Sequence, residues 1–160
     1  MYNDPIAFFF TISTYGTWLP GDSRGWVEYK SGWQLPDPIV ELEACAEMSE
    51  DACVLNQTER AIVEEQLMET CDFRGWTLHA KNCRSNHMHY VIGGEATPKK
   101  IRIDTKAWCT RRLKRDSRQR RENWWTERGS VRWVYNEDGL ATVIEYVNEA
   151  QDRKYRDHLS

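Results

Sequence analysis

Residues 76–94 read WTLHAKNCRSNHMHYVIGG, and this stretch decides the fold. Two short runs rich in β-branched, aromatic and apolar residues, at 76–81 and 87–92, are separated by a polar turn at 82–86. Two such runs with a short polar connection predict a pair of antiparallel strands joined as a hairpin. Gly93 and Gly94 follow the second run and mark its end.

A helical stretch lies on each side of this hairpin. The first runs to about residue 70 from a cap at Asn56 or Thr58, and its apolar positions recur at the spacing of one helix face. The same spacing recurs over residues 101–113, which follow Pro98. We therefore expect each helix to connect strands, as a crossover between parallel neighbours.

Further strands lie at the two ends of this unit. Residues 6–14 (IAFFFTIST) and 131–135 (VRWVY) are β-branched and aromatic, and a last helix is expected over residues 138–152. The order predicts an α+β fold: a ferredoxin-like split βαβ sandwich with helices on one face of an antiparallel or mixed sheet of about four to five strands, plus a C-terminal helix. The stretch 25–38 has no clear period and is expected to be a long loop.

Length and composition are those of a single globular domain over residues 1–160. No apolar run approaches the ~20 residues that span a bilayer. The first residues lack the pattern of a signal peptide, so we expect a cytoplasmic protein that does not engage a membrane. The five cysteines form no CxxC pair, which argues against a zinc ribbon and favours free thiols used in packing.

The net charge of −3 conceals two regions of opposite sign. From Lys99 to Arg121 there are eleven Lys and Arg against two acids, whereas Asp37 to Asp72 contain eleven acids and one base. A basic run of this kind forms either a solvated helix face or a nucleic-acid-binding surface. For a DNA-binding role we select Lys106, Arg111, Arg112, Lys114, Arg115, Arg118, Arg120 and Arg121. Three nearby tryptophans could stack on bases or belong to the core: Trp124, Trp125 and Trp133.

The second strand of the hairpin contains His87 and His89. Residues two apart on a strand point to the same face, with Cα atoms roughly 6.6 Å apart, so the two imidazoles can converge on one divalent ion. Two nitrogen ligands leave coordination positions open, as a Lewis-acid metal requires. On this pattern alone, the residues can also be two partly exposed histidines of a sheet face.

The last helix contains a tyrosine at the edge of its apolar stripe. The stripe consists of Leu140, Val143, Ile144 and Val147. Tyr146 lies about 100° from the centre of this stripe, which suits either a residue that faces a cleft or an ordinary boundary tyrosine. Tyr135 at a strand end and Tyr155 in the polar tail are the rival candidates for a nucleophile.

With these motifs the chain resembles the single-tyrosine HUH transposases, and more closely the REP-associated tyrosine transposase-like proteins. His87-Met88-His89 matches the His-hydrophobic-His motif that gives the superfamily its name. Four further stretches match in the same order: FTISTYGTWLPGD at 10–22, RGWV at 24–27, WWTERGSVRW at 124–133 and IEYVNEAQ at 144–151. The resemblance covers nearly the whole chain.

The resemblance implies a metal-dependent single-stranded DNA endonuclease and strand transferase. Tyr146 would be the nucleophile that forms a 5′-phosphotyrosine beside a DNA hairpin, REP-like or at an element end. His87 and His89 would hold Mg²⁺ or Mn²⁺, and the protein would act as a monomer or homodimer. Two alternatives stay open: a hairpin-binding protein of the same fold without catalysis, and an RNA-binding ferredoxin-like module.

One position departs from the family pattern. A Gln or Asn that binds the metal commonly follows the tyrosine by four residues, and here that position is Ala150. Glu149 lies about 60° from Tyr146 around an ideal helix, and Gln151 lies about 140° away on the other side. A π-bulge could bring Gln151 into place. Either residue is therefore a candidate for the third metal ligand.

Overall fold

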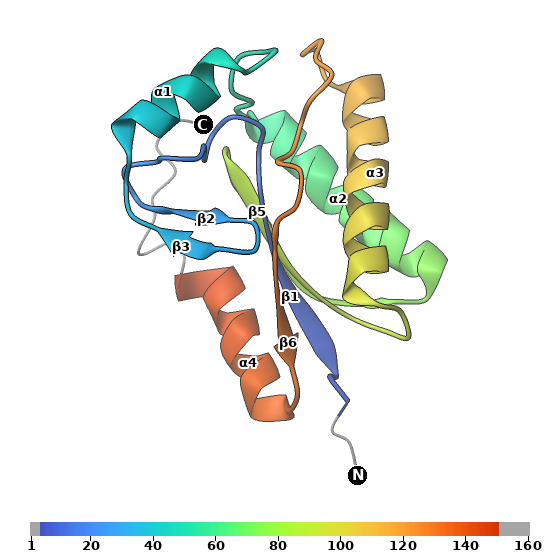
Figure 1. Ribbon diagram of the computed structural model, residues 1–160. Helices are drawn as coiled ribbons and strands as arrows, with labels where there is room; N and C mark the ends of the chain where they lie inside the picture. Colours follow the sequence, from blue (N-terminus) through green and yellow to red (C-terminus); the bar gives the residue numbers. More distant parts are fainter. Residues whose placement is uncertain (1–3, 151–160) are drawn as a thin grey trace.

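The structure is a computed structural model that describes residues 4–150 (Figure 1). Its main sheet has four strands in the order β4-β5-β1-β6. The strands are β1 (Ala7–Ser13), β4 (Thr77–Cys83), β5 (His87–Gly93) and β6 (Ser130–Val134). The predicted α+β, split βαβ arrangement is confirmed, including the hairpin formed by β4 and β5.

The sheet is antiparallel throughout, so the expected parallel neighbours are wrong. β1 pairs with β5 on one side and with β6 on the other, and β4 pairs with β5, all in the antiparallel sense. β1 and β4 run in the same direction, but β5 lies between them. The hairpin returns β5 to the place beside β1 and leaves β4 at the edge.

Two helices, α2 (Gln57–Arg74) and α3 (Pro98–Asp116), cover one face of the sheet (Figure 1). Their apolar residues pack with Phe10, Ile12 and Tyr90 in the larger of two cores. α2 begins with a capping box, in which Asn56 and Glu59 each accept a hydrogen bond from the other's backbone N–H. Gly75, with φ of 73°, ends this helix four residues beyond the expected end, because a left-handed cap favours glycine.

The opposite face is covered by α4 (Glu137–Glu145), which continues as a π-helical turn over Tyr146–Ala150. This unit packs on Phe9, Val91 and Val134 in the smaller core, and Val147 is fully buried there. β1 is therefore buried on both faces, which explains why its apolar residues form a continuous run. The single α-helix expected over 138–152 is corrected to an α-helix followed by a π turn, and positions 151 and 152 lie outside the described residues.

The expected long loop after residue 25 is wrong. It contains a small hairpin, β2 (Trp26–Glu28) and β3 (Gly32–Gln34), followed by helix α1 (Pro38–Ala46). Asp37 caps α1 by accepting hydrogen bonds from the backbone N–H groups of Ile39 and Val40. No residue of α1 is buried, so the helix has no apolar stripe from which its period could be read.

The expected use of the cysteines as free thiols is confirmed. All five cysteines are free thiols, and four of them are buried in packing positions. Among the helices within residues 4–150, none combines the length and apolar character needed to cross a membrane.

Candidate active site

The two histidines of β5 lie on the sheet face that α4 covers. Their rings are 4.8 Å apart between centroids, so the predicted convergence of the two imidazoles is present in the structure. His87 is half-buried and His89 is buried. On the neighbouring strand β1, Thr11 lies opposite His89 and Ser13 lies opposite His87.

Each imidazole is oriented by a neighbouring side-chain oxygen at its Nδ1 atom. His87 Nδ1 is 2.6 Å from Asn86 Oδ1, and His89 Nδ1 is 2.8 Å from Thr11 Oγ1. The Asn86 oxygen can only accept, so His87 donates its Nδ1 proton to it. The Thr11 hydroxyl can accept in the same way. In metalloproteins, a hydrogen bond at one ring nitrogen commonly fixes the histidine so that the other nitrogen meets the metal.

Burial keeps the ring of His89 in its neutral form. Loss of solvent, and to a lesser degree the positive charge that His87 can carry, lower the pKa of His89 to about 3. A neutral imidazole is the form that binds a metal ion. His89 therefore has the chemistry of a ligand at any pH near neutrality.

Tyr146 lies beside this pair, at the first residue of the π turn. Its half-buried ring is 5.7 Å from the His89 ring and 5.9 Å from the Phe9 ring, both in edge-to-face orientation. Asn82 of β4, directly opposite His89, donates a hydrogen bond of 2.8 Å to the carbonyl of Val147. This bond ties the π turn to the sheet at the level of the histidines. Single π turns of this kind occur frequently at functional sites.

The rival tyrosines do not share this place. Tyr135 follows Val134, which lies opposite Ala7, four residues along β1 from the Thr11 position and roughly 14 Å away. Tyr155 lies outside the described residues. Within residues 4–150, Tyr146 is thus the predicted nucleophile that the structure brings to the histidines.

The third metal ligand stays a prediction. No group of three or more His, Cys, Asp and Glu side chains that could hold a metal ion occurs in the described part of the chain, so Glu149, which is exposed, does not complete such a group with the histidines. Gln151 lies outside the described residues. The π-helical turn that Gln151 would need in order to point toward the metal is present at Tyr146–Ala150.

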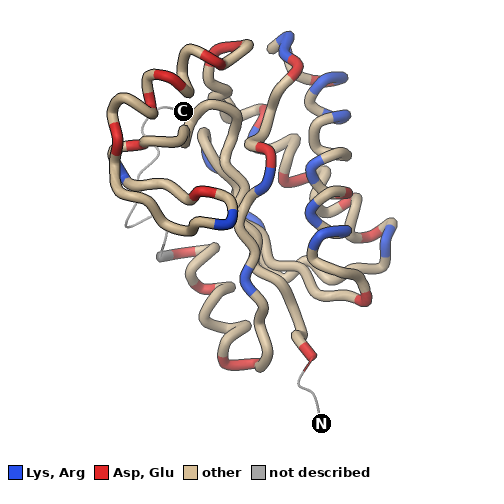
Figure 2. Tube along the Cα trace, viewed as in Figure 1, with Lys and Arg blue, Asp and Glu red and all other residues tan. Residues whose placement is uncertain are grey.

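The basic residues selected for DNA lie on α3 and the segment after it (Figure 2). α3 packs on the sheet face opposite to the one on which His89 contacts Phe9. Several are held by acidic partners: Arg112 pairs with Glu65, Glu69 and Asp116, Arg115 pairs with Asp116, and Lys114 pairs with Glu122. Arg111 stacks on Trp108, and Arg120 and Arg121 donate to backbone carbonyls. Arg118 lies in the segment after the helix. Their role in DNA binding stays a prediction.

The tryptophans near this basic run are mostly structural. Trp124 and Trp125 are 2% and 8% exposed and belong to the larger core, so a stacking role on DNA is wrong for both. Trp125 pairs with Thr14 in an isolated antiparallel β-bridge, which holds this part of the chain against the end of β1. Trp133 is exposed, with its ring edge-on to Phe8.

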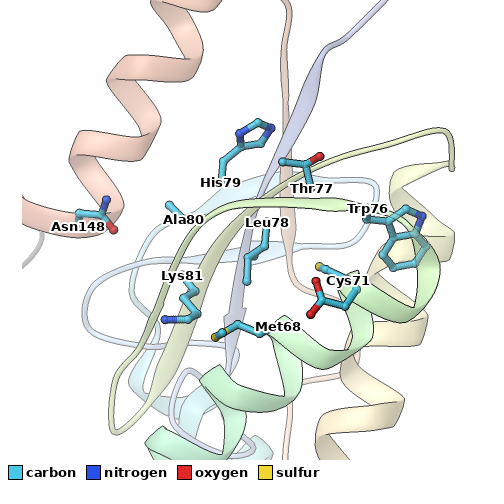
Figure 3. Close-up of a pocket in the computed structure, with 10 residues that line it drawn as sticks. Met68, Cys71, Trp76, Thr77, Leu78, His79, Ala80, Lys81 and Asn148 are labelled. Atoms are coloured by element: carbon cyan, nitrogen blue, oxygen red, sulfur yellow. The ribbon is translucent and has the colours of Figure 1, made fainter.

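An open pocket of about 650 Å³ is separate from this site. It runs along the edge strand β4 beside α2, with Trp76 near one end and Asn148 of the π turn at the other (Figure 3). Its lysine, Lys81, is paired with Glu64 at 3.3 Å. Its lining includes His79 but not His87, His89 or Tyr146.

Topology and site together define a ferredoxin-like α+β sandwich whose added helix carries a tyrosine to paired histidines. Among solved structures, the chain is similar to the REP-associated tyrosine transposase bound to a REP hairpin. That match has a TM-score of 0.58 at 12% identity and covers 96% of this chain and 72% of that one. The fold implied by the sequence resemblance is therefore confirmed. No protein-family model and no curated protein matches the sequence.

Proposed function

We propose that the protein is a metal-dependent single-stranded DNA endonuclease and strand transferase of the HUH transposase type, acting beside DNA hairpins. The observation that carries this proposal is the placement of the Tyr146 ring 5.7 Å from the ring of His89, which itself adjoins His87. The transposase of similar fold was solved bound to a REP hairpin, which supports hairpin DNA as the partner.

The histidine pair fits a divalent cation such as Mg²⁺ or Mn²⁺. His89 is neutral and has its Nδ1 atom occupied by Thr11, and His87 has its Nδ1 atom occupied by Asn86. Two imidazole ligands and a third ligand, for which Glu149 and Gln151 are the candidates, would leave positions for the substrate. A bound cation would polarise the scissile phosphate and stabilise the charge that develops on it.

The protein residues then account for bond making and bond breaking. The Tyr146 Oη atom attacks the phosphorus and forms the new bond, while the bond from phosphorus to the 3′ oxygen breaks. The phenol loses its proton and the leaving 3′ oxygen gains one, so the products are a 5′-phosphotyrosine and a free 3′-OH. Since the phosphoester bond is kept in the intermediate, the 3′-OH of a second strand can reverse the step and rejoin DNA.

The ring contacts of Tyr146 support its role as a positioned nucleophile. Phe9 and His89 contact the ring at its edge, and the Asn82 bond to Val147 holds the backbone one residue away. A nucleophile held in place reacts with a much higher effective concentration than a mobile one.

A pooled library of labelled single-stranded hairpin DNAs, incubated with Mn²⁺ and analysed on denaturing gels, tests the proposal. We expect a DNA-linked protein band that disappears with a chelator, in Tyr146→Phe and in His87→Ala/His89→Ala. Tyr135→Phe is the matched control and should keep the band. No band with the wild-type protein, or a band that survives Tyr146→Phe, contradicts the proposal.

The second candidate is a hairpin-binding protein of the same fold without catalysis. Ala150 at the usual ligand position favours it, together with the lack of a three-ligand group in residues 4–150. It predicts tight hairpin binding on native gels with no covalent band. The structure does not favour the RNA-binding alternative. Such modules stack bases on an open sheet face, and here helices cover both faces of the sheet.

A further inference from the structure

The small hairpin β2–β3 displays an apolar and aromatic face to solvent. Val27 lies opposite Trp33, so the two side chains share a face, and Tyr29 follows two residues after Val27. These three residues are 71%, 59% and 62% exposed. An isolated two-stranded hairpin is marginally stable in water, and exposed rings clustered on one are a frequent sign of a binding surface.

Arg128 connects this face to a basic pocket. Its guanidinium lies 3.7 Å from the centroid of the Tyr29 ring. The same residue lines an open pocket of about 400 Å³ together with Arg102, Ile103, Lys106 and Glu127. Three cations against one acid give the pocket a net positive charge, which suits a phosphate group.

The pocket is built by the backbone that leads into β6. Lys106 of α3 donates from Nζ to the carbonyls of Thr126 and Glu127, at 2.7 and 2.9 Å. Burial lowers the pKa of Lys106 to about 8. The lysine therefore holds the segment that carries Arg128 against α3, so the position of the guanidinium between Tyr29 and the pocket is set by the fold.

The segment that carries Arg128 leads into β6, which lies two strands from β5 and its histidines. Ser130, two residues after Arg128, lies opposite Thr11, the residue whose hydroxyl contacts His89. Two strand spacings, roughly 10 Å, separate β6 from the strand of the histidines. Because β6 is an edge strand, a flexible polymer can pass around it from the pocket to the histidine face.

We propose that Val27, Tyr29, Trp33, Arg128 and Arg102 form a strip that binds the single strand of DNA leading to the active site. A phosphate would lie in the pocket between Arg102 and Arg128, and bases would stack on the exposed rings. Single-strand-binding proteins combine these two elements, a positive groove for the backbone and aromatic rings for the bases. The choice of DNA rests on the proposed function, but binding at the strip requires neither metal nor Tyr146.

The test is fluorescence anisotropy with a labelled oligothymidylate of about 12 nucleotides, within the usual site size of such proteins. The titrations are made with a chelator at several salt concentrations. Tyr29→Ala removes a ring, and Arg128→Gln removes a charge. Phe73→Ala is the control for the ring, because Phe73 is 77% exposed with Arg74 stacked on it at the far end of α2. Lys99→Gln is the control for the charge, on an exposed lysine of α3 outside the pocket.

The two variants should differ in how salt affects them. We expect Tyr29→Ala to weaken binding by about 5- to 150-fold without changing the dependence on salt. Arg128→Gln should weaken binding and make the negative slope of log K against log salt less steep by about 0.7, because the protein then neutralises one phosphate fewer. Both controls should bind like the wild-type protein. Wild-type protein that does not bind the oligonucleotide, or controls that weaken binding as much as the variants do, would overturn the inference.

Failure of the strip and failure of the proposed function give different results. If no covalent band forms in any hairpin library but the anisotropy pattern holds, the strip stands and the endonuclease proposal falls. If the band forms but Tyr29→Ala and Arg128→Gln bind as the wild-type protein does, DNA reaches Tyr146 by another route and the strip is wrong.

Discussion

Replacement of Thr11 by valine removes the oxygen that contacts His89 Nδ1 and keeps the shape of the side chain. In the structure, this oxygen lies 2.8 Å from the nitrogen. With the hydroxyl as acceptor, Nδ1 carries the proton and the ring presents Nε2 to a metal ion. Loss of such a partner typically lowers metal affinity 10- to 100-fold, or about 1.4 to 2.7 kcal/mol. We expect Thr11→Val to lose Mn²⁺ affinity by this amount.

Calorimetric titration of Mn²⁺ measures the affinity, and Thr11→Ser, which keeps the hydroxyl, is the matched control. Nitrogen-15 NMR of the metal-free protein at about pH 8 reports which ring nitrogen carries the proton, independently of metal. The wild-type protein should show His89 protonated at Nδ1, and Thr11→Val should show a mixture. Thr11 does not orient His89 for metal if Thr11→Val binds Mn²⁺ as tightly as the wild-type protein, if Thr11→Ser loses as much affinity, or if wild-type His89 carries its proton on Nε2.

Three further predictions concern the apo protein. As pH falls from about 6.5 to about 3, His89 becomes protonated in the unfolded state but stays neutral in the folded state, where its pKa is about 3. The free energy of unfolding should therefore decrease with falling pH more steeply in the wild-type protein than in His89→Gln, by up to ~1.4 kcal/mol per pH unit. The same pH dependence in both proteins would contradict the neutral state of buried His89. Asn82→Ala leaves the Val147 carbonyl without its donor. It should cost about 1–3 kcal/mol in urea unfolding and speed amide exchange in the π turn, whereas unchanged exchange would show that the bond does not hold the turn. Phe10→Ala, at a fully buried ring stacked on Tyr90, should cost about 3–5 kcal/mol, and Trp33→Ala on the exposed hairpin only about 0.5 or less; similar losses would contradict the burial pattern.

The parts of the fold that could be predicted are those in which burial leaves a period in the sequence. β5, which contains His89, and β1, which contains Phe10, are largely buried, and α2 has both a cap and an apolar face. Helix α1 and the β2–β3 hairpin bury almost nothing, so their sequences contain turn residues and exposed apolar residues without a readable pattern. The antiparallel sense of the sheet depends on β5, and not β4, being the neighbour of β1. No local sequence pattern indicates which of the two strands pairs with β1.

The candidate site divides in the same way. The shared face of His87 and His89 and the flank position of Tyr146 follow from strand and helix periods. Thr11 could not be predicted, because it meets His89 across 78 residues of sequence through the register of two strands. Arg128 could not be predicted for a similar reason, since its neighbours come from α3 and from a hairpin whose sequence resembles a loop. The pairing of Arg112 with Glu65 and Glu69 of α2 could not be predicted either, because these residues are more than 40 positions apart in the sequence.

The central claim is that Tyr146 attacks DNA at the histidine pair, and mass spectrometry of the covalent product tests it most directly. The wild-type protein is incubated with hairpin DNA and Mn²⁺, digested with nuclease and protease, and its tyrosine peptides are sequenced. We expect a nucleotide linked through a 5′ phosphate to Tyr146 alone, formed only when metal is present. A nucleotide on Tyr135 or another tyrosine, or tight hairpin binding without any linked peptide, would contradict it.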